Sequence, residues 1–367
     1  MLEVLRNDLF DLNITLPSGF YQIYKNRISE PEFYFDNLLV IEHDFDVCDS
    51  VGTVFTLVDK ELYNAIESGD IVSIVQNKLR VILSRKANHN TLLITERCNN
   101  LCLFCSQPPR KENDSWLLDI GKKALAAFKF NGVVGISGGE PLLYGDEFIH
   151  FLEFVKMNAP ETKLHVLTNG RQFSDLKFAQ KIANVTENMA ISFGIPLYSA
   201  IAEVHNKLVA SEYAFDETIL GMINAGNSGI NIELRFIPTQ LNYNDLPSVI
   251  ELAGRIFSNI NQISIMNLEA TGWARRNWDA LYIAPERYQD VIKLSIEMAE
   301  KCYLPIALFN YPLCHLDEEA WLYSIQSISD WKNYYPKVCN DCYMKKECGG
   351  YFSSSYGKYH QEPRAII

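Results

Sequence analysis

Two patterns of hydrophobic and polar residues divide the chain. The first 90 residues contain short runs of strand-forming residues, at 38–41, 51–58, 71–75 and 79–83. The polar residues 76–78 between the last two runs predict a hairpin, and one short helix is expected at 59–68, ending at Gly69. Residues 1–90 are therefore predicted to form a small β-rich N-terminal domain.

From residue 91 the pattern changes to short apolar strands that alternate with amphipathic helices. We expect strands at 91–95, 133–137, 164–168, 189–195, 231–237 and 262–266. We expect helices at 118–130, 146–158, 174–185, 215–226, 245–257 and 285–300. Six β-α units predict a parallel sheet with right-handed crossovers, and six units are fewer than the eight of a closed barrel. The fold class predicted for residues 91–300 is α/β, a partial (β/α)6 TIM-like barrel.

The periodicity fades after residue 301. Residues 302–367 hold five of the nine cysteines, together with Trp, Tyr and Gly. This composition is typical of a small domain that is organised by metal rather than by a hydrophobic core. We therefore expect a third, cysteine-rich C-terminal domain at 301–367.

Composition and charge narrow the classes of function. Hydrophobic residues make up 48% of the chain, which is ordinary for a folded protein, and the net charge is −12 at pH 7. A general nucleic-acid coat protein would be basic, so no nucleic-acid partner is expected. No run of 18 apolar residues exists and the N-terminus has no signal-peptide h-region, so neither a membrane span nor secretion is expected. We expect a cytoplasmic, reduced protein.

The nine cysteines are clustered. An odd number in a reducing compartment argues against a disulfide framework. Three fall within eight residues at 98–105 and three within ten residues at 339–348, and such clusters are typical of metal sites. Cys48 and Cys302 are expected to be ordinary buried thiols.

The first cluster has the spacing C-x3-C-x2-C and consists of Cys98, Cys102 and Cys105. It directly follows the first barrel strand, so it occupies the edge of the sheet where parallel folds place their chemistry. Three thiolates there can hold three irons of a [4Fe–4S] cluster and leave the fourth iron to a small molecule. A zinc knuckle or three buried thiols are the alternatives for this spacing alone.

Small polar turns follow the next two strands. The second strand leads into Gly138-Gly139-Glu140-Pro141, and the third leads into Thr168-Asn169-Gly170. Glycines let a ligand approach the backbone closely, although a tight β-α turn with a helix-capping Glu140 is the alternative. Strand four carries Ser192 and strand five carries Arg235, and each can equally be a satisfied polar group within a sheet.

The order of these features resembles the radical S-adenosylmethionine (SAM) superfamily: a three-cysteine loop with an aromatic residue before its third cysteine, a GGEP turn and a TNG turn. The resemblance implies a SAM-cleaving [4Fe–4S] cluster on Cys98, Cys102 and Cys105. It implies that SAM is contacted by Phe104, Gly138, Gly139, Glu140, Thr168, Asn169, Ser192 and Arg235. Within this set Glu140 is placed near the amino group of SAM, and Arg235 suits its carboxylate.

The resemblance also implies radical chemistry. An electron enters the cluster and passes to the sulfonium of SAM, and homolysis yields methionine and a 5′-deoxyadenosyl radical that abstracts hydrogen from the substrate. An electron donor such as a flavodoxin or ferredoxin is then expected as a partner.

The second cluster has the spacing C-x2-C-x5-C and consists of Cys339, Cys342 and Cys348. It resembles the auxiliary-cluster region of the SPASM and Twitch branches of the superfamily. The SPASM pattern continues with x3-C, but Phe352 stands there, which argues against two auxiliary clusters. Cys314 is the expected fourth ligand and Cys302 the alternative. Four thiolates suit an auxiliary [4Fe–4S] cluster, with a structural zinc as the alternative, and residues 301–367 are thus expected to be an iron–sulfur domain.

Three longer segments resemble the maturases of His-Xaa-Ser repeat peptide systems, of the type called HxsC: residues 94–110, 268–278 and 327–352. The resemblance implies oxidative modification, such as a cross-link, of a ribosomally made precursor peptide, alongside a second radical SAM protein. Gly272 and Ala274 match a G-x-A element of peptide-modifying enzymes. Trp273, Arg275 and Arg276 either grip a peptide or pack the loop onto the next helix.

Two other classes of function stay open. One is a radical SAM enzyme that acts on a small molecule or nucleobase, because neither an auxiliary cluster nor an acidic surface excludes it. The other is a non-catalytic iron–sulfur electron carrier, which would need no GGEP turn.

Overall fold

The computed structural model describes residues 9–12, 16–25, 35, 37–42, 50–51, 54–326 and 332–367. Its Cα positions form two compact units, and each is described by itself below. Unit 1 comprises residues 1–95, 114–137 and 150–164, and unit 2 comprises residues 96–113, 138–149 and 165–367. The three predicted domains stay predictions, and Cys48 lies outside the described residues. None of the helices in the described ranges is long and apolar enough to cross a bilayer.

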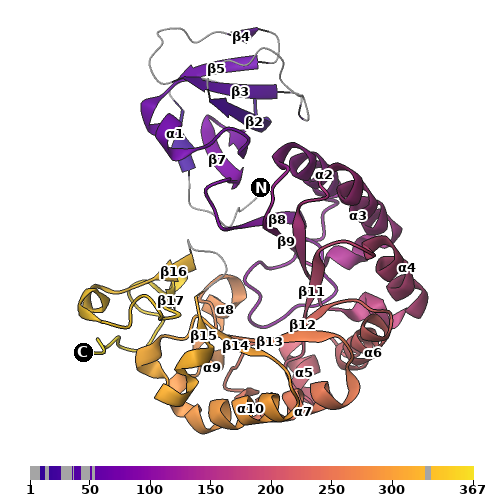
Figure 1. Ribbon diagram of the computed structural model, residues 1–367, viewed down its shortest axis with the longest axis vertical. Helices are drawn as coiled ribbons and strands as arrows, with labels where there is room; N and C mark the ends of the chain where they lie inside the picture. The colour runs from indigo at the N-terminus through magenta and orange to yellow at the C-terminus, as the bar shows by residue number, and fades with distance from the viewer. Residues whose placement is uncertain are drawn as a thin grey trace. The chain divides into compact units, whose positions relative to one another are not determined.

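A seven-stranded sheet forms the N-terminal part of unit 1, in the order β1-β7-β6-β2-β3-β5-β4 (Figure 1). Its strands are β1 Leu9–Asp11, β2 Gly19–Lys25, β3 Asn37–Glu42, β4 Ser50–Val51, β5 Val54–Val58, β6 Ile71–Val75 and β7 Lys78–Leu83. Strands β6 and β7 pair antiparallel around Gln76 and Asn77, whose φ angles of 50° and 61° are those of a tight hairpin turn. Helix α1, Lys60–Ala65, begins where the Asp59 carboxylate accepts the Leu62 N–H at 2.9 Å. The predicted hairpin and helix are confirmed.

An eight-stranded sheet carries the β-α repeat, in the order β15-β14-β13-β12-β11-β10-β9-β8. Its strands are β8 His89–Thr95, β9 Val133–Gly138, β10 Lys163–Leu167, β11 Ile191–Pro196, β12 Ile232–Phe236, β13 Ile260–Met266, β14 Ile306–Phe309 and β15 Ser324–Ile325. The helices are α2 Trp116–Phe128, α3 Asp146–Asn158, α4 Leu176–Thr186, α5 Ala202–Val209, α6 Ala214–Asn227, α7 Leu246–Ile256, α8 Gly272–Arg276, α9 Trp278–Leu281 and α10 Gln289–Lys301. The pairs from β11 to β15 are parallel. The predicted α/β partial barrel is confirmed, and its six strands and six helices lie within a few residues of their expected ends.

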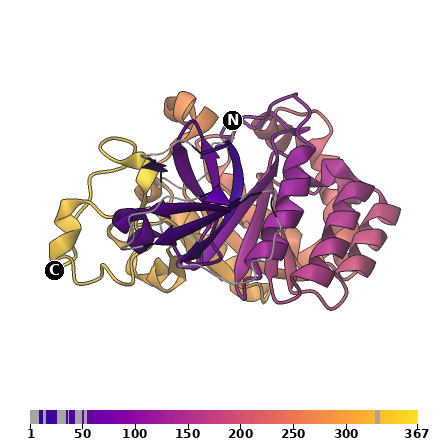
Figure 2. The same cartoon turned by 90° about the horizontal axis from the view of Figure 1, so that it is seen from above.

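The two faces of the unit 2 strands differ in chemistry. On β12, Ile232, Leu234 and Phe236 are fully or almost fully buried, whereas Glu233 and Arg235 alternate with them. Helices α4, α6, α7 and α10 cover one side of these strands in Figure 1, and Figure 2 shows helices side by side from above. The apolar residues face this helical layer, and the charged residues point to the concave side, which is called the inner face below.

Strands β14 and β15 extend the sheet beyond the six predicted strands. They contain four and two residues, so their hydrophobic runs are too short to be recognised as strands from the sequence. After them, β16 Asn333–Tyr334 and β17 Tyr351–Phe352 form a small antiparallel pair in the cysteine-rich part.

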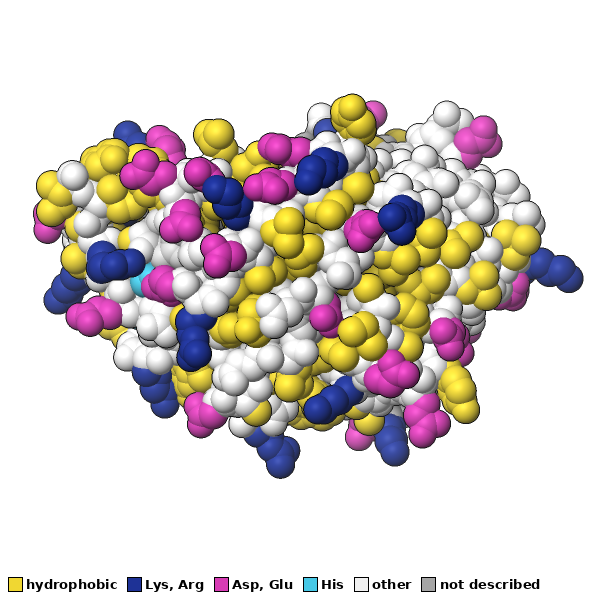
Figure 3. Space-filling model, turned by 90° about the horizontal axis from the view of Figure 1, so that it is seen from below, with side chains coloured by type: hydrophobic (Ala, Val, Ile, Leu, Met, Phe, Trp, Pro, Cys, Tyr) yellow, Lys and Arg dark blue, Asp and Glu magenta, His cyan; other side chains and the backbone are white. Residues whose placement is uncertain are grey.

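Charged side chains of both signs are scattered among hydrophobic ones on the face drawn in Figure 3. Among the described residues on that face, neither sign forms a continuous field. The net charge of −12 is therefore not concentrated there.

Candidate functional site

The three-cysteine loop follows β8 and is anchored by backbone hydrogen bonds. The Leu101 N–H donates to the Val209 carbonyl, and the Leu103 N–H donates to the Leu208 carbonyl, both at 2.9 Å. These carbonyls belong to the last turn of α5, a helix that the sequence pattern did not predict. The end of α5 therefore supports the loop.

The thiols of Cys98, Cys102 and Cys105 are close enough to influence one another's ionisation. Burial raises the pKa of Cys98 to about 12, and the charges of Glu140 and Cys105 also raise it. Burial raises the pKa of Cys102 as well, and Cys105 and Cys98 add to the effect. The Asn100 N–H already points at the Cys98 Sγ, at 3.4 Å. Buried thiols of this kind become thiolates when they bind a cation, so the three residues fit a cationic iron–sulfur core.

Glu140 joins the two predicted turns by direct hydrogen bonds. Its carboxylate is 1% exposed, accepts the Leu142 N–H at 2.9 Å, and thereby caps a short 3-10 helix at 141–144. It also accepts the Thr168 hydroxyl at 2.6 Å and the Asn169 N–H at 2.5 Å. Three of its roughly four lone-pair sites are thus occupied. Glu140 thus braces the two turns and caps the short helix, and its expected contact with the amino group of SAM stays a prediction.

Asn169 connects this brace to the three-cysteine loop, since its Nδ2 donates to the Asn99 Oδ1 at 2.6 Å. Two positions after Asn169 stands a residue that the sequence reasoning missed. Arg171 donates from Nη1 to the Asn99 carbonyl at 2.8 Å and to the Asn100 Oδ1 at 2.7 Å, and from Nε to Glu217 of α6 at 2.5 Å. The only sequence signal for this role is a basic residue directly after the TNG turn. The cysteine loop, the GGEP turn and the TNG turn therefore form one hydrogen-bonded assembly.

Gly139 is required where it stands because the backbone of the cysteine loop touches it. A Cβ at this position would lie 2.1 Å from the Arg97 carbonyl oxygen. The neighbouring Glu140 N–H donates to the same oxygen at 2.7 Å. Gly139 thus permits a backbone contact between two parts of the site. Gly138 is the last residue of β9, beside this contact.

Ser192, the SAM contact expected on strand four, lies near the start of that strand. Ser192 is the second residue of β11, four residues before the carboxyl end, so it lies about 13 Å from that edge. The carboxyl end instead leads to Tyr198, which is 8% exposed. Phe104 packs edge-on against the Tyr198 ring, with centroids 4.8 Å apart. Ser192 lies near the start of its strand, and its expected contact with SAM stays a prediction.

Arg235 lies on the inner face of β12 and belongs to a charged group there. Its Nε is 4.0 Å from Glu233 Oε1, and its Nη2 contacts the Met266 Sδ at 2.5 Å. Burial raises the pKa of Glu233, but Arg235 and His165 outweigh burial and lower it to about 2. Glu233 hydrogen-bonds His165 on β10. Gly194 of the intervening strand β11 leaves room for this contact, because a Cβ on Gly194 would lie 3.0 Å from the Arg235 side chain and 3.1 Å from that of Glu233. Thioether sulfur is a weak acceptor, so the guanidinium keeps donors for a carboxylate.

The loop after β13 packs onto the three-cysteine loop. A Cβ at Gly272, whose φ is 49°, would lie 2.4 Å from the Cys105 carbonyl oxygen. The Trp273 N–H donates to that oxygen at 2.8 Å. The Arg275 guanidinium bonds the Ala270 carbonyl at 2.9 Å and lies over the Tyr359 ring. Arg275 therefore packs the loop although it is exposed, and Arg276 is exposed as well.

The C-terminal cysteines also converge. Burial raises the pKa of Cys339 to about 11, and the charges of Cys314, Cys348 and Cys342 raise it further. Cys302, the alternative fourth ligand, packs against α7 instead, with its Sγ 2.6 Å from where a Cβ on Gly254 would be. Cys314 as the fourth ligand stays a prediction, which the charge of Cys314 acting on Cys339 supports.

Backbone N–H groups point at two of these sulfurs. The Leu313 and Gly350 N–H groups lie 3.4 Å from the Cys348 Sγ, and the Ile366 N–H lies 3.4 Å from the Cys342 Sγ. Hydrogen bonds to sulfur stabilise thiolate ligands, so these residues fit a four-cysteine site. Within the described ranges, no three His, Cys, Asp or Glu side chains are grouped tightly enough to hold a single metal ion.

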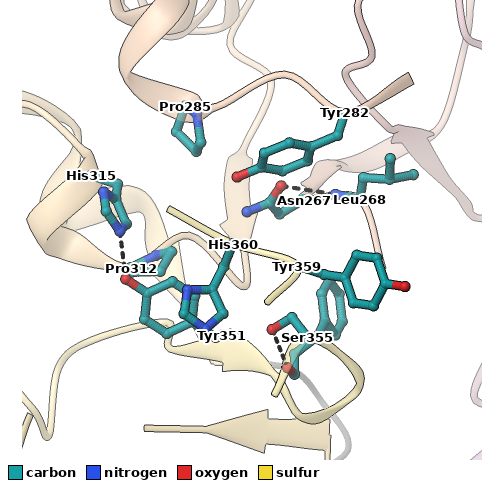
Figure 4. Close-up of a pocket in the computed structure, with 11 residues that line it drawn as sticks. Asn267, Leu268, Tyr282, Pro285, Pro312, His315, Tyr351, Ser355, Tyr359 and His360 are labelled. Carbon is teal, nitrogen blue, oxygen red and sulfur yellow. Dashed lines mark hydrogen bonds between the residues drawn. The ribbon is translucent and has the colours of Figure 1, made fainter. Parts of the chain in front are cut away.

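A small cavity lies beside Cys314, and Figure 4 shows its lining. His315 is 3% exposed and bonds Glu286 through Nδ1 and the Tyr351 hydroxyl through Nε2, the latter at 2.5 Å. The Tyr351 hydroxyl lies 3.7 Å from the Cys314 Sγ. The cavity measures about 10 Å³, which is room for one water at most, so it is not a substrate pocket.

Comparison with known proteins finds a family match in the central part of the chain. Residues 92–253 match the model of the Radical SAM superfamily. The match supports a radical SAM enzyme, and the family implies SAM and one [4Fe–4S] cluster. It contains the three-cysteine loop and both turns, which are the parts that the hydrogen bonds join.

Two curated relatives are similar to part of this chain. A GTP 3′,8-cyclase of Paenarthrobacter nicotinovorans is 26% identical over 209 residues, which is 53% of this chain and 55% of that protein. An Fe-coproporphyrin III synthase of Methanosarcina barkeri is 30% identical over 167 residues, which is 43% of this chain and 39% of that protein. The chain thus spans about half or less of the length of these relatives.

Among solved structures, the SuiB protein of Streptococcus suis bound to S-adenosylmethionine is similar to this chain. It is 14% identical with a TM-score of 0.44, and the similarity covers 60% of this chain and 47% of SuiB.

Proposed function

We propose that this chain cleaves SAM reductively at the three-cysteine loop and uses the resulting radical to oxidise a ribosomally made peptide. The observation that supports SAM cleavage best is the brace through Glu140, Thr168 and Asn169, because it ties the cysteine loop to both turns within the region that matches the superfamily.

Each group of residues has a part in this proposal. Cys98, Cys102 and Cys105 would hold the cluster, which supplies the electron for cleavage of SAM when both are bound. Arg235 would bind the carboxylate of SAM, since its remaining donors face the inner side of the sheet. Glu233 lies 4.0 Å from that guanidinium and would help to position it. The chain thus orients SAM, and the cofactors carry the redox chemistry.

Oxidation of a peptide needs an acceptor for the electron that a substrate radical loses. We infer that an auxiliary [4Fe–4S] cluster on Cys314, Cys339, Cys342 and Cys348 fills this role, supported by their convergence and by the N–H groups aimed at their sulfurs. A precursor peptide of the His-Xaa-Ser type, a flavodoxin or ferredoxin and a second radical SAM protein are the proposed partners. Arg276 is an exposed cation of the loop at 268–278 and would be available to a peptide.

A second candidate function is conversion of a small molecule. It is favoured by the relatives, whose names refer to GTP and to Fe-coproporphyrin III. Net oxidation of a peptide and conversion of a nucleotide give different products, so one experiment separates them.

The cleavage step is tested by replacing Cys98, Cys102 and Cys105 together with Ala. We expect 5′-deoxyadenosine production to stop while the C-terminal iron is retained, with Cys302→Ala as the matched control that loses neither. Continued cleavage of SAM by the triple variant would refute the proposed site.

The substrate is tested by anaerobic incubation of the enzyme with SAM, a reductant, and either His-Xaa-Ser peptides or GTP. Mass spectrometry should find peptide that has lost two hydrogens. Peptides that stay unmodified while GTP is converted would replace the first candidate with the second.

A further inference from the structure

His165 lies on the inner face of β10, and no role has been given to it. It alternates along the strand with Val166, whose side chain is fully buried. The Nε2 atom of His165 hydrogen-bonds the Glu233 carboxylate on β12. In the described part of the chain, no hydrogen-bond partner of its Nδ1 atom is found. One nitrogen of the ring is therefore held by the protein, and the other is left open.

The charge of Glu233 decides which nitrogen of His165 carries the hydrogen. Burial raises the pKa of Glu233, but Arg235 and His165 lower it to about 2, so this side chain is a carboxylate at neutral pH. An ionised carboxylate only accepts hydrogen bonds, so the Nε2 atom of His165 is the donor in this contact. The Nδ1 atom of the neutral ring therefore carries a lone pair that can accept a proton.

Glu233 is itself fixed by its neighbours on the sheet. The Arg235 Nε lies 4.0 Å from its Oε1, and Ser264 of β13 hydrogen-bonds the carboxylate. Ser264 is fixed in turn, because its hydroxyl oxygen accepts the Gln262 Nε2 at 2.8 Å. Side chains from β12 and β13 thus orient the imidazole ring of His165 on β10. A base that is oriented by a carboxylate is a recurring arrangement of catalytic proton acceptors.

The open nitrogen can be reached from the inner face. The His165 side chain is 13% exposed, and within the described residues its Nδ1 atom is not sealed from solvent. The group also lies beside Arg235, which is proposed to bind the carboxylate of SAM, so a substrate close to SAM on this face would meet the imidazole. A histidine with a purely structural role in a sheet would normally have both nitrogens paired.

We propose that the Nδ1 atom of His165 is the catalytic base that accepts a proton from a hydroxyl or ring N–H group of the peptide during its oxidation. The inference rests on the proposed function, because it names the reacting group of that substrate. The balance of the reaction requires such a base. A carbon of the peptide loses one hydrogen atom to the 5′-deoxyadenosyl radical and then bonds the oxygen or nitrogen of the second group. The proton of that group goes to His165, and one electron goes to the proposed auxiliary cluster.

The test uses His165→Gln, because glutamine can still donate to Glu233 but cannot accept a proton. The matched control is His150→Gln, since His150 is exposed on α3. After anaerobic incubation with SAM, reductant and peptide, mass spectrometry counts 5′-deoxyadenosine and the peptide that has lost two hydrogens. In His165→Gln the amount of oxidised peptide per 5′-deoxyadenosine should fall about tenfold or more, while 5′-deoxyadenosine and iron content stay within about twofold. His150→Gln should match wild type in all three.

Two further measurements separate a base from a structural residue. Imidazole added to His165→Gly should restore oxidised peptide, because it can occupy the vacated space and accept the proton, whereas a structural role would give no rescue. In wild type labelled with 15N-histidine, the Nδ1 signal of His165 should shift when peptide is added without reductant, and the signal of His150 should not. This second measurement does not depend on a variant that folds.

The outcomes distinguish this inference from the proposed function. If wild type oxidises the peptide and His165→Gln keeps the same ratio of products, the inference is wrong and the proposed function is unaffected. The same holds if the Nδ1 signal of His165 stays in place while the peptide binds. If wild type cleaves SAM but oxidises no peptide, the proposed substrate is wrong and the inference fails with it.

Discussion

Replacement of Glu233 by Gln should reveal how much the charged group on the inner face contributes to stability. The side chain keeps its shape, but it loses the charge that faces Arg235 at 4.0 Å and that pairs with His165. The carboxyl has a pKa of about 2 in the folded chain against an ordinary value of 4.5. At 1.36 kcal/mol for each pKa unit, ionised Glu233 stabilises the fold by about 3 kcal/mol.

The sign of the pH dependence follows from the lowered pKa. A group whose pKa is depressed by folding contributes stability that is complete above its unfolded value, here 4.5, and that is lost as the pH falls toward about 2. Wild type should therefore exceed Glu233→Gln by about 3 kcal/mol at neutral pH, and the difference should shrink steadily below about pH 4.5.

Urea unfolding of the full chain before cluster loading, in steps from about pH 7 to about pH 3, measures this difference. The matched control is Glu251→Gln, because Glu251 pairs with Arg255 on the surface of α7 and the two side chains are 43% and 74% exposed. Its effect should stay within about 0.5 kcal/mol at every pH. Equal stability of wild type and Glu233→Gln at neutral pH, or a difference that does not change with pH, would refute the reasoning.

Three further substitutions test other parts of the structure. Gly272→Ala places a Cβ 2.4 Å from the cysteine-loop backbone and should lower both iron content and SAM cleavage several-fold, whereas Gly357→Ala, with no atom within 4 Å of its Cβ, should leave iron assays and cleavage unchanged. Glu140→Gln replaces an acceptor with a donor inside the brace and should lower stability by about 1–3 kcal/mol in urea unfolding; an unchanged midpoint would rule out the brace. Cys314→Ser should lower the iron content after reconstitution and Cys302→Ser should not, and the opposite result would exchange their roles.

Sequence patterning predicted the barrel because its signal is local. A buried run followed by a small polar turn marks the carboxyl end of a parallel strand, and this pattern located the GGEP and TNG turns at the correct edge. What the side chains do there is not local. Glu140 was correctly singled out, but its lone pairs are taken by Thr168 and Asn169, which lie 28 and 29 residues further along the chain. No local sequence pattern predicts the hydrogen bonds between Glu140 and these two residues.

The residues that were missed resemble ordinary core or surface residues in the sequence. Arg171 follows the TNG turn and looks like a solvated cation. The sequence leaves Cys314 and Cys302 as alternatives for the fourth ligand, since both precede the C-x2-C-x5-C segment.

The hydrogen bond from the Asn277 Nδ2 to the Leu103 carbonyl, at 2.7 Å, joins residues that are 174 positions apart. Ribosomes add about 5–20 residues per second, so the cysteine loop is made roughly 10–35 s before the segment that packs onto it. During that interval its three thiols lack the support of the loop after β13. Delivery of iron to a nascent chain would therefore meet an open loop, whereas delivery to the finished chain would meet one already covered by Gly272 and Trp273.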